Sequence, residues 1–232
     1  MFKLIKLEIK KFKLKGNLKG VIIANLAILA FLVISIFGTK ANNEIIFNSW
    51  DNGFLFTNVF VRITFSIFVS VLISRLIFGE YKSKTINILF TYPISRKKVM
   101  IAKLATTTAF AFISMVISNI FISSSLYILN IFINFISEAL TMEILINNLI
   151  SIFVYSLLFS LISLIPVYVG FLRKSGSSVI VTSIILISIL NSGNAGHTLS
   201  SYVLIPIILA ILGVLCSYLF IKDIEKIDVP NF

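Results

Sequence analysis

Charged residues are scarce in this sequence, and acidic residues are the scarcest of them. Of its 232 residues 12% are charged and only nine are Asp or Glu, whereas about a quarter of the residues in a soluble domain are charged. Cys216 and His197 are each the single residue of their type, which excludes a disulfide framework and a Cys/His zinc site. Without a G-x-x-x-x-G-K-[ST] loop the chain has no recognisable ATP site, and no catalytic, cofactor-binding or metal-binding residue is predicted.

Long apolar runs are what the sequence has instead. Hydrophobic residues make up 58% of the chain, and its mean hydropathy is +1.06. Because lipid satisfies no backbone hydrogen bonds, runs of about 17–25 apolar residues cross the bilayer as helices. The sequence therefore predicts an all-α integral membrane protein, with a single transmembrane domain over residues 1–232. Its six predicted spans are 21–38, 54–78, 104–133, 145–171, 177–192 and 202–221.

Two of these spans contain unusual features. The fourth contains Pro166 near its end, and we expect a kink there because proline removes a backbone donor and crowds the preceding turn. The fifth has a short apolar centre, Val179 to Leu190. It reaches full length only if the Ser, Gly and Asn residues on either side enter the membrane.

Basic residues lie almost entirely on one side of the predicted spans. Of the 20 Lys and Arg residues, 18 fall before the first span, between the second and third (counting Arg75 in the last turn of the second), between the fourth and fifth, or after the sixth, and only Lys40 falls in the alternate segments. Because Lys and Arg accumulate in cytoplasmic segments, both termini are predicted to be cytoplasmic, including the tail 222–232. The net charge of +11 then reflects topology, so no nucleic-acid partner is predicted.

Arg62 is the one charge in the interior of a predicted span. The favoured interpretation is that its stem extends to the outer interface and keeps the guanidinium hydrated. The alternative is that Arg62 faces a cavity and contacts an anionic substrate or lipid group. Acidic residues are absent from the interior of all six spans, which disfavours an ion-coupled carrier.

Two predicted cytoplasmic segments have helical apolar patterns. In the N-terminal segment 1–20, apolar residues recur at helical spacing beside lysines, which predicts an amphipathic helix on the inner leaflet. In the segment 79–103, Ile86, Leu89 and Phe90 fall on one side of a short helix. Pro93 should end that helix, and Ser95 can begin another that continues into the third span. The apolar patch is either a handle for a partner or a surface resting on lipid.

At this second segment the sequence resembles the ABC-2 family of bacterial ABC-transporter permeases. The family pattern is a Glu after the second span, then Gly-Thr, apolar residues, a Pro-x-Ser-Arg turn and a Lys. The matching positions are Glu80, Thr85, Leu89, Pro93, Ser95, Arg96 and Lys103, with Lys84 in place of the usual Gly. The opening stretch, Leu4 to Phe12, is similar to that of small permeases in lantibiotic- and bacitracin-type efflux and immunity exporters.

The resemblance implies a type V (ABC-2) exporter-like fold in the bacterial plasma membrane. Two permease subunits, identical or homologous, would sit on two copies of an ATP-binding subunit, which would hold the ATP and Mg. The resemblance also implies a coupling helix that docks on the ATPase. The candidate coupling residues are Glu80, Thr85, Ile86, Leu89, Phe90, Pro93, Ser95, Arg96 and Lys103.

The exporter interpretation has alternatives from other classes. By resemblance, the transported compounds would be amphipathic or antimicrobial peptides, or similar hydrophobic compounds. An ATP-independent carrier or channel is one alternative, and a membrane immunity or sensor protein that binds a toxin without moving it is another. Neither alternative assigns a role to the segment 79–103. Substitutions in that segment therefore discriminate between the exporter and the two alternatives.

Overall fold

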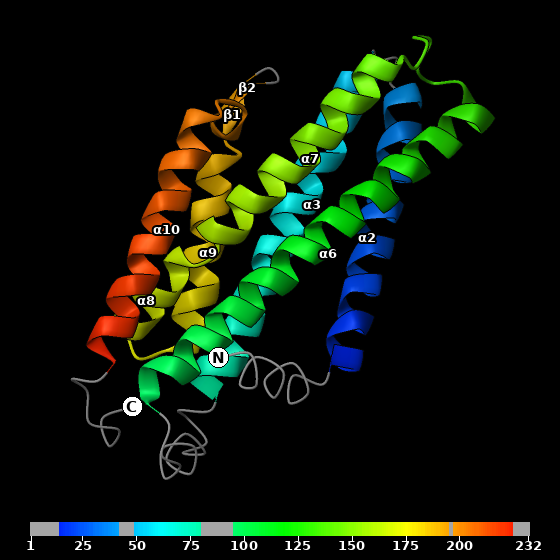
Figure 1. Ribbon diagram of the computed structural model, residues 1–232. Helices are drawn as coiled ribbons and strands as arrows, with labels where there is room; N and C mark the ends of the chain where they lie inside the picture. The colour runs from blue at the N-terminus through cyan, green and yellow to red at the C-terminus, as the bar shows by residue number, and fades with distance from the viewer. Residues whose placement is uncertain (1–13, 42–48, 80–94, 195–196, 225–232) are drawn as a thin grey trace. The chain divides into compact units, whose positions relative to one another are not determined.

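The computed structural model describes residues 14–41, 49–79, 95–194 and 197–224, and almost all of them are helical (Figure 1). The elements in chain order are α2 (Leu14–Ala41), α3 (Trp50–Ile73), the π-helix η1 (Ser74–Phe78), α6 (Arg96–Ile133), α7 (Met142–Ile162), α8 (Ile165–Leu172), α9 (Gly176–Leu190), the two-residue strands β1 (Gly193–Asn194) and β2 (His197–Thr198), the 3-10 turn η2 (Leu199–Ser201) and α10 (Leu204–Asp223).

Five helical segments among the described residues are long and apolar enough to cross a membrane. They are Gly16–Gly38, Trp50–Phe78, Arg96–Ile133, Met142–Leu172 and Leu204–Asp223. Their exposed faces are rich in Leu, Ile and Phe, as expected for helices that contact lipid. The prediction of an all-α membrane protein is therefore confirmed, although several helices begin before the predicted spans.

The fifth predicted span corresponds to α9, which has 15 residues. At 1.5 Å per residue such a helix is about 22 Å long, shorter than the roughly 30 Å of a hydrocarbon core. A full crossing at 177–192 therefore stays a prediction. The same holds for the interfacial helix, because residues 14–20 belong to α2 while residues 1–13 lie outside the described part of the chain.

Pro166 divides the fourth predicted span into two helices. The helix α7 ends at Ile162, and α8 begins at Ile165 with the proline in its first turn. Between them the chain makes a turn in which the Leu164 amide donates to the Leu161 carbonyl at 3.0 Å. Proline is tolerated in the first turn because the amide it lacks has no helical partner there. The predicted kink is thus confirmed as a break between helices.

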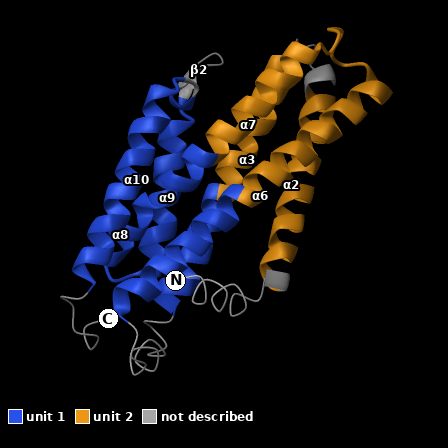
Figure 2. Cartoon of the chain, viewed as in Figure 1, with its two compact units in different colours: residues 1–14, 66–112, 157–232 blue, residues 15–65, 113–156 orange. Residues whose placement is uncertain are grey.

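The chain forms two compact units, coloured separately in Figure 2. Unit 1 comprises Met1–Leu14, Ser66–Phe112 and Leu157–Phe232, and unit 2 comprises Lys15–Phe65 and Ile113–Ser156. Three helices, α3, α6 and α7, contribute to both units. Each unit therefore has its own core and is described separately.

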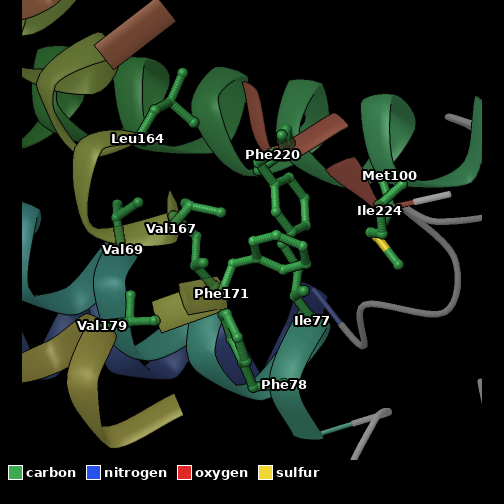
Figure 3. Close-up of a cluster of buried hydrophobic side chains, with 13 residues drawn as sticks. Val69, Ile77, Phe78, Met100, Leu164, Val167, Phe171, Val179, Phe220 and Ile224 are labelled. Atoms are coloured by element: carbon green, nitrogen blue, oxygen red, sulfur yellow. The ribbon is translucent and has the colours of Figure 1, made fainter. Parts of the chain in front are cut away.

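In unit 1, α8 packs against both α9 and α10, and α9 also packs against η1. A cluster of buried apolar side chains fills the space between these elements (Figure 3). The ring of Phe171 on α8 meets the ring of Phe220 on α10 edge to face, with centroids 5.1 Å apart. Phe78 and Val179 bring η1 and α9 into the same cluster. This core holds the end of α3 against the C-terminal helices.

In unit 2, α2 and α3 are joined by aromatic packing. The ring centroids of Phe31 and Phe60 are 4.7 Å apart. The first turn of α3 is tied to the loop before α7, because the backbone amide of Trp50 donates to Glu138 Oε2 at 3.0 Å and its indole Nε1 donates to the Glu138 carbonyl at 2.8 Å. These bonds fix where α3 begins.

Candidate functional site

Two groups of buried polar residues distinguish the interior of this protein from its apolar surface. Among the described residues, the buried charged side chains are Lys103 in unit 1 and Arg62 in unit 2, and no buried residue is acidic. Nor do three or more His, Cys, Asp or Glu side chains come together as metal ligands in the described ranges. The two basic residues are therefore the centres from which each group is built.

Lys103 joins the start of α6 to the end of α3. Its side chain is 0% exposed, and its Nζ donates to the backbone carbonyl of Leu76 at 3.0 Å. Leu76 belongs to η1, the π-helical turn that ends α3. Carbonyls in the last turn of a helix are the ones least satisfied by the helix itself. The ammonium group of Lys103 therefore donates to a carbonyl that the end of α3 does not fully satisfy by itself.

The π-helical turn lies against α9 at very short range. A Cβ built on Gly176 of α9 would overlap Ser74 Oγ of η1, and it would lie 3.2 Å from Phe78 Cβ of the same turn. Gly176 allows this close approach because it carries no side chain. π-helical turns are frequent at functional sites, and sequence reasoning did not predict this one.

Only part of the predicted coupling segment is described. The helix α6 begins at Arg96, and the Ser95 carbonyl accepts bonds from the amides of Lys98 and Val99 at 3.0 and 3.4 Å. This agrees with the predicted helix start at Ser95 and its continuation through Lys103. The remaining candidate residues lie outside the described part of the chain: Glu80, Thr85, Ile86, Leu89, Phe90 and Pro93.

Arg62 lies inside unit 2 and does not extend to the outer interface. Its side chain is 3% exposed, and the helix that carries it begins at Trp50 rather than at the predicted residue 54. Twelve residues of helix separate Arg62 from that end by about 18 Å, which is far more than an Arg stem spans. The favoured interpretation from sequence is therefore wrong, because the span begins earlier than its apolar pattern indicated.

The guanidinium of Arg62 is held by groups from two helices. Its Nε donates to the Asn58 carbonyl on α3 at 3.0 Å. Its Cζ lies 4.3 Å from the ring centroid of Tyr155 on α7, within the range of a cation–π interaction. The side chain of Asn58 in turn donates from Nδ2 to Asn148 Oδ1 at 3.2 Å. We call these four residues the Arg62 cluster.

Sequence reasoning missed three members of the Arg62 cluster. Asn58 lies one helical turn before Arg62, and an i, i+4 spacing of polar residues in an apolar span is the signal that points to it. Asn148 and Tyr155 lie seven residues apart on α7, two turns along one face. Nothing in the sequence pairs that face with α3, so the partners of Arg62 come only from the tertiary structure.

These features define a multi-pass helical membrane protein with an apolar outer surface and a basic, polar interior. The family model described as "ABC-2 family transporter protein" matches residues 4–191, and the chain belongs to this family. It is therefore the membrane-spanning permease component of an ABC transporter, a kind of protein that works with an ATP-binding partner. The family resemblance found in the sequence is thus confirmed.

A relative of similar length supports the same assignment. The "Uncharacterized protein YcbO" of Bacillus subtilis (strain 168) is 37% identical over 225 residues, covering 97% of this chain and 99% of the relative. No solved structure matches the chain. The similarity therefore extends over nearly the whole chain, and the name of the relative states no substrate.

Proposed function

We propose that this permease exports amphipathic or antimicrobial peptides, or similar hydrophobic compounds, out of the cell or its membrane. ATP hydrolysed by a separate subunit provides the energy, and the assembly contains two ATP-binding subunits and a second permease, identical or homologous. Family membership over residues 4–191 is the observation that carries the transport role. The peptide substrate and the outward direction rest on the similarity of residues 4–12 to small efflux and immunity permeases.

We further propose that the segment 79–103 couples the permease to its ATPase. The helical elements on either side of it are joined inside unit 1, since Lys103 on α6 donates to Leu76 in η1 at 3.0 Å. A movement of the segment would therefore be transmitted to α3 and α6 together. Glu80, Ile86 and Phe90 are the residues we expect to contact the ATPase.

The orientation in this proposal follows from charge. Lys and Arg gather in the segments that begin and end the chain and in the segment 79–103, which supports a topology with both termini and the ATPase on the cytoplasmic side of a bacterial plasma membrane. The membrane lipid is then the remaining partner, and it contacts the exposed apolar faces of the helices.

Purification of the tagged chain from its native cells in mild detergent tests the proposal. Phe90→Asp puts a charge on the apolar patch, and Glu80→Lys reverses a charge at the start of the segment. Each should reduce the amount of co-purifying Walker-motif ATPase, or uncouple ATP hydrolysis from export, without preventing membrane insertion. Lys222→Glu is the matched control, because it reverses an exposed charge at the end of α10, outside the segment.

The outcomes separate the classes of function. Recovery of an ATPase with the wild type and the Lys222→Glu variant, but less with Phe90→Asp, supports the coupling role. Export that is unaltered in both segment variants would contradict it. Recovery of the chain alone, under conditions that preserve a known ABC complex, would instead favour a carrier or an immunity protein.

A further inference from the structure

The π-helical turn η1 lies directly before the predicted coupling segment and is held by two other elements of unit 1. The Nζ atom of Lys103, on α6, donates to the Leu76 carbonyl of η1 at 3.0 Å. The helix α9 packs against the same turn. Because η1 continues α3 without a break, a displacement at the start of the coupling segment reaches this turn first. What the turn contacts therefore determines where the displacement goes.

Two glycines let η1 approach the helices α8 and α9 with no side chain in between. A Cβ built on Gly176 of α9 would overlap Ser74 Oγ and would lie 3.2 Å from Phe78 Cβ. A Cβ built on Gly170 of α8 would lie 3.0 Å from Phe78 Cζ. Phe78 also belongs to the buried cluster of unit 1 (Figure 3). Close-packed interiors have low compressibility and transmit strain, so a movement of η1 against these backbones is passed on to the helices.

The helices α8 and α9 form a tight hairpin, residues 165–190, which we call the α8–α9 pair. The Ser175 amide, just before α9, donates to the Gly170 carbonyl of α8 at 3.0 Å. Lys174 has a left-handed backbone with a φ of 50°, and together these features form the Schellman motif that often ends a helix. A Cβ built on Gly170 would also overlap a methyl group of Val179 on α9. The pair is therefore expected to move as one body.

We propose that η1 passes the movement of the coupling segment to the α8–α9 pair, and that Gly176 is a positioning residue for this step. The absence of a side chain at Gly176 lets Ser74 and Phe78 press directly on the backbone of α9. The Lys103 bond keeps α6 and η1 together while the segment between them moves. ATP-driven movement of that segment then appears as a displacement of α9. This inference rests on the proposed coupling role and names the helices that receive the movement.

The test follows α9 in the complex of the full chain with its co-purified ATPase in phosphatidylcholine nanodiscs. Ser188→Cys provides a thiol at an exposed position of α9, and Cys216→Ser removes the single native cysteine. The rate of labelling by fluorescein maleimide is measured with Mg-ATP and vanadate and again without nucleotide. We expect nucleotide to change this rate at least about fivefold, the lower end of couplings between distant sites. Lys98→Cys, at an exposed position near the start of α6, should respond too and reports on the coupling segment itself.

Two variants change the contact between η1 and α9 in the Ser188→Cys background. Gly176→Val places a branched side chain against η1, and a rotation of Ser74 Oγ does not make room for it because Phe78 Cβ lies 3.2 Å from the new Cβ. It should reduce the nucleotide effect to less than about twofold. Exchanging the two side chains, Gly176→Ser with Ser74→Gly, keeps one hydroxymethyl group at the contact and should restore the effect.

The matched control in the same background is Gly213→Ala. Its new Cβ would overlap the Leu161 carbonyl, outside the contact between η1 and α9, so it disturbs close packing elsewhere in unit 1. Gly213→Ala should lower the thermal midpoint and keep the full nucleotide effect on labelling. Equal co-purification of the ATPase with Gly176→Val and with its parent should show that the segment variants are not needed to explain the loss.

The outcomes either support or overturn the inference. A nucleotide effect that is lost in Gly176→Val and restored by the exchange supports it. An effect in Gly176→Val within about twofold of its parent, or an equal loss in Gly213→Ala, would overturn it. If Lys98→Cys responds to nucleotide and Ser188→Cys does not, this inference fails while the coupling proposal stands. If neither responds, the coupling proposal fails and this inference fails with it.

Discussion

Replacing Lys103 with Met should destabilise unit 1 measurably. The substitution preserves most of the side-chain volume, so little cavity is created, but it removes the donor of the 3.0 Å bond to the Leu76 carbonyl. A hydrogen bond to a charged group contributes about 1.5–3 kcal/mol. Part of this loss is offset because a charge is no longer buried. Since the carbonyl stays without its donor, we expect a net loss of about 1–2 kcal/mol.

Cys216 is a convenient reporter for this prediction. It is the single cysteine of the chain, it lies half-buried on α10, and α10 belongs to unit 1 together with Lys103. A thiol-reactive fluorophore that labels Cys216 on heating should report a midpoint lowered by about 2–8 °C, at roughly 2–4 °C per kcal/mol for a chain of this size.

The matched control for Lys103→Met is Lys98→Met. Lys98 lies near the start of the same helix, where its side chain is exposed, so the identical substitution there should shift the midpoint by less than about 1 °C, as surface changes usually do. Equal midpoints for Lys103→Met and the wild type would refute the reasoning. A Lys98→Met shift as large as that of Lys103→Met would refute it as well, because a general loss of positive charge would then explain both.

Two other predictions concern close packing and the first turn of α3, and both can be followed by circular dichroism on heating. Gly213→Ala should destabilise the protein by about 1–3 kcal/mol, because its Cβ would overlap the backbone carbonyl of Leu161. Gly38→Ala, with nothing within 4 Å of the new methyl, should instead stabilise the helix by about 0.5–1 kcal/mol. Trp50→Phe should cost about 1 kcal/mol, since the 2.8 Å bond from Nε1 to the Glu138 carbonyl is lost. A Trp50→Phe midpoint equal to that of the wild type would show that this bond does not hold α3 in place.

The helical membrane architecture could be predicted because it depends on local properties of the chain. Apolar runs of sufficient length define the spans, and Pro166 interrupts α7 whatever the tertiary contacts are. The start of α6 after Ser95 is equally local. The starts of α2 and α3 could be predicted less well. The helix α3 begins four residues before its apolar run because Glu138, distant in sequence, accepts bonds from the backbone and indole of Trp50.

The interior sites could be predicted only in part. A charge within a span singled out Arg62 with two interpretations open, but whether its guanidinium turns outward or inward depends on Tyr155 and Asn58, of which the first is on another helix. Lys103 was assigned by family resemblance to coupling, and its bond to Leu76 is a feature that the resemblance did not contain. Pairings between helices far apart in sequence leave no periodic signal, so the partners of both basic residues had to come from the structure.

Buried basic residues join neighbouring helices in the described interior. Arg62 on α3 lies over the ring of Tyr155 on α7, and Lys103 on α6 donates to the Leu76 carbonyl at the end of α3. Partners of these kinds lower the cost of burying a charge. Each contact therefore ties a different helix to α3, α7 within unit 2 and α6 within unit 1.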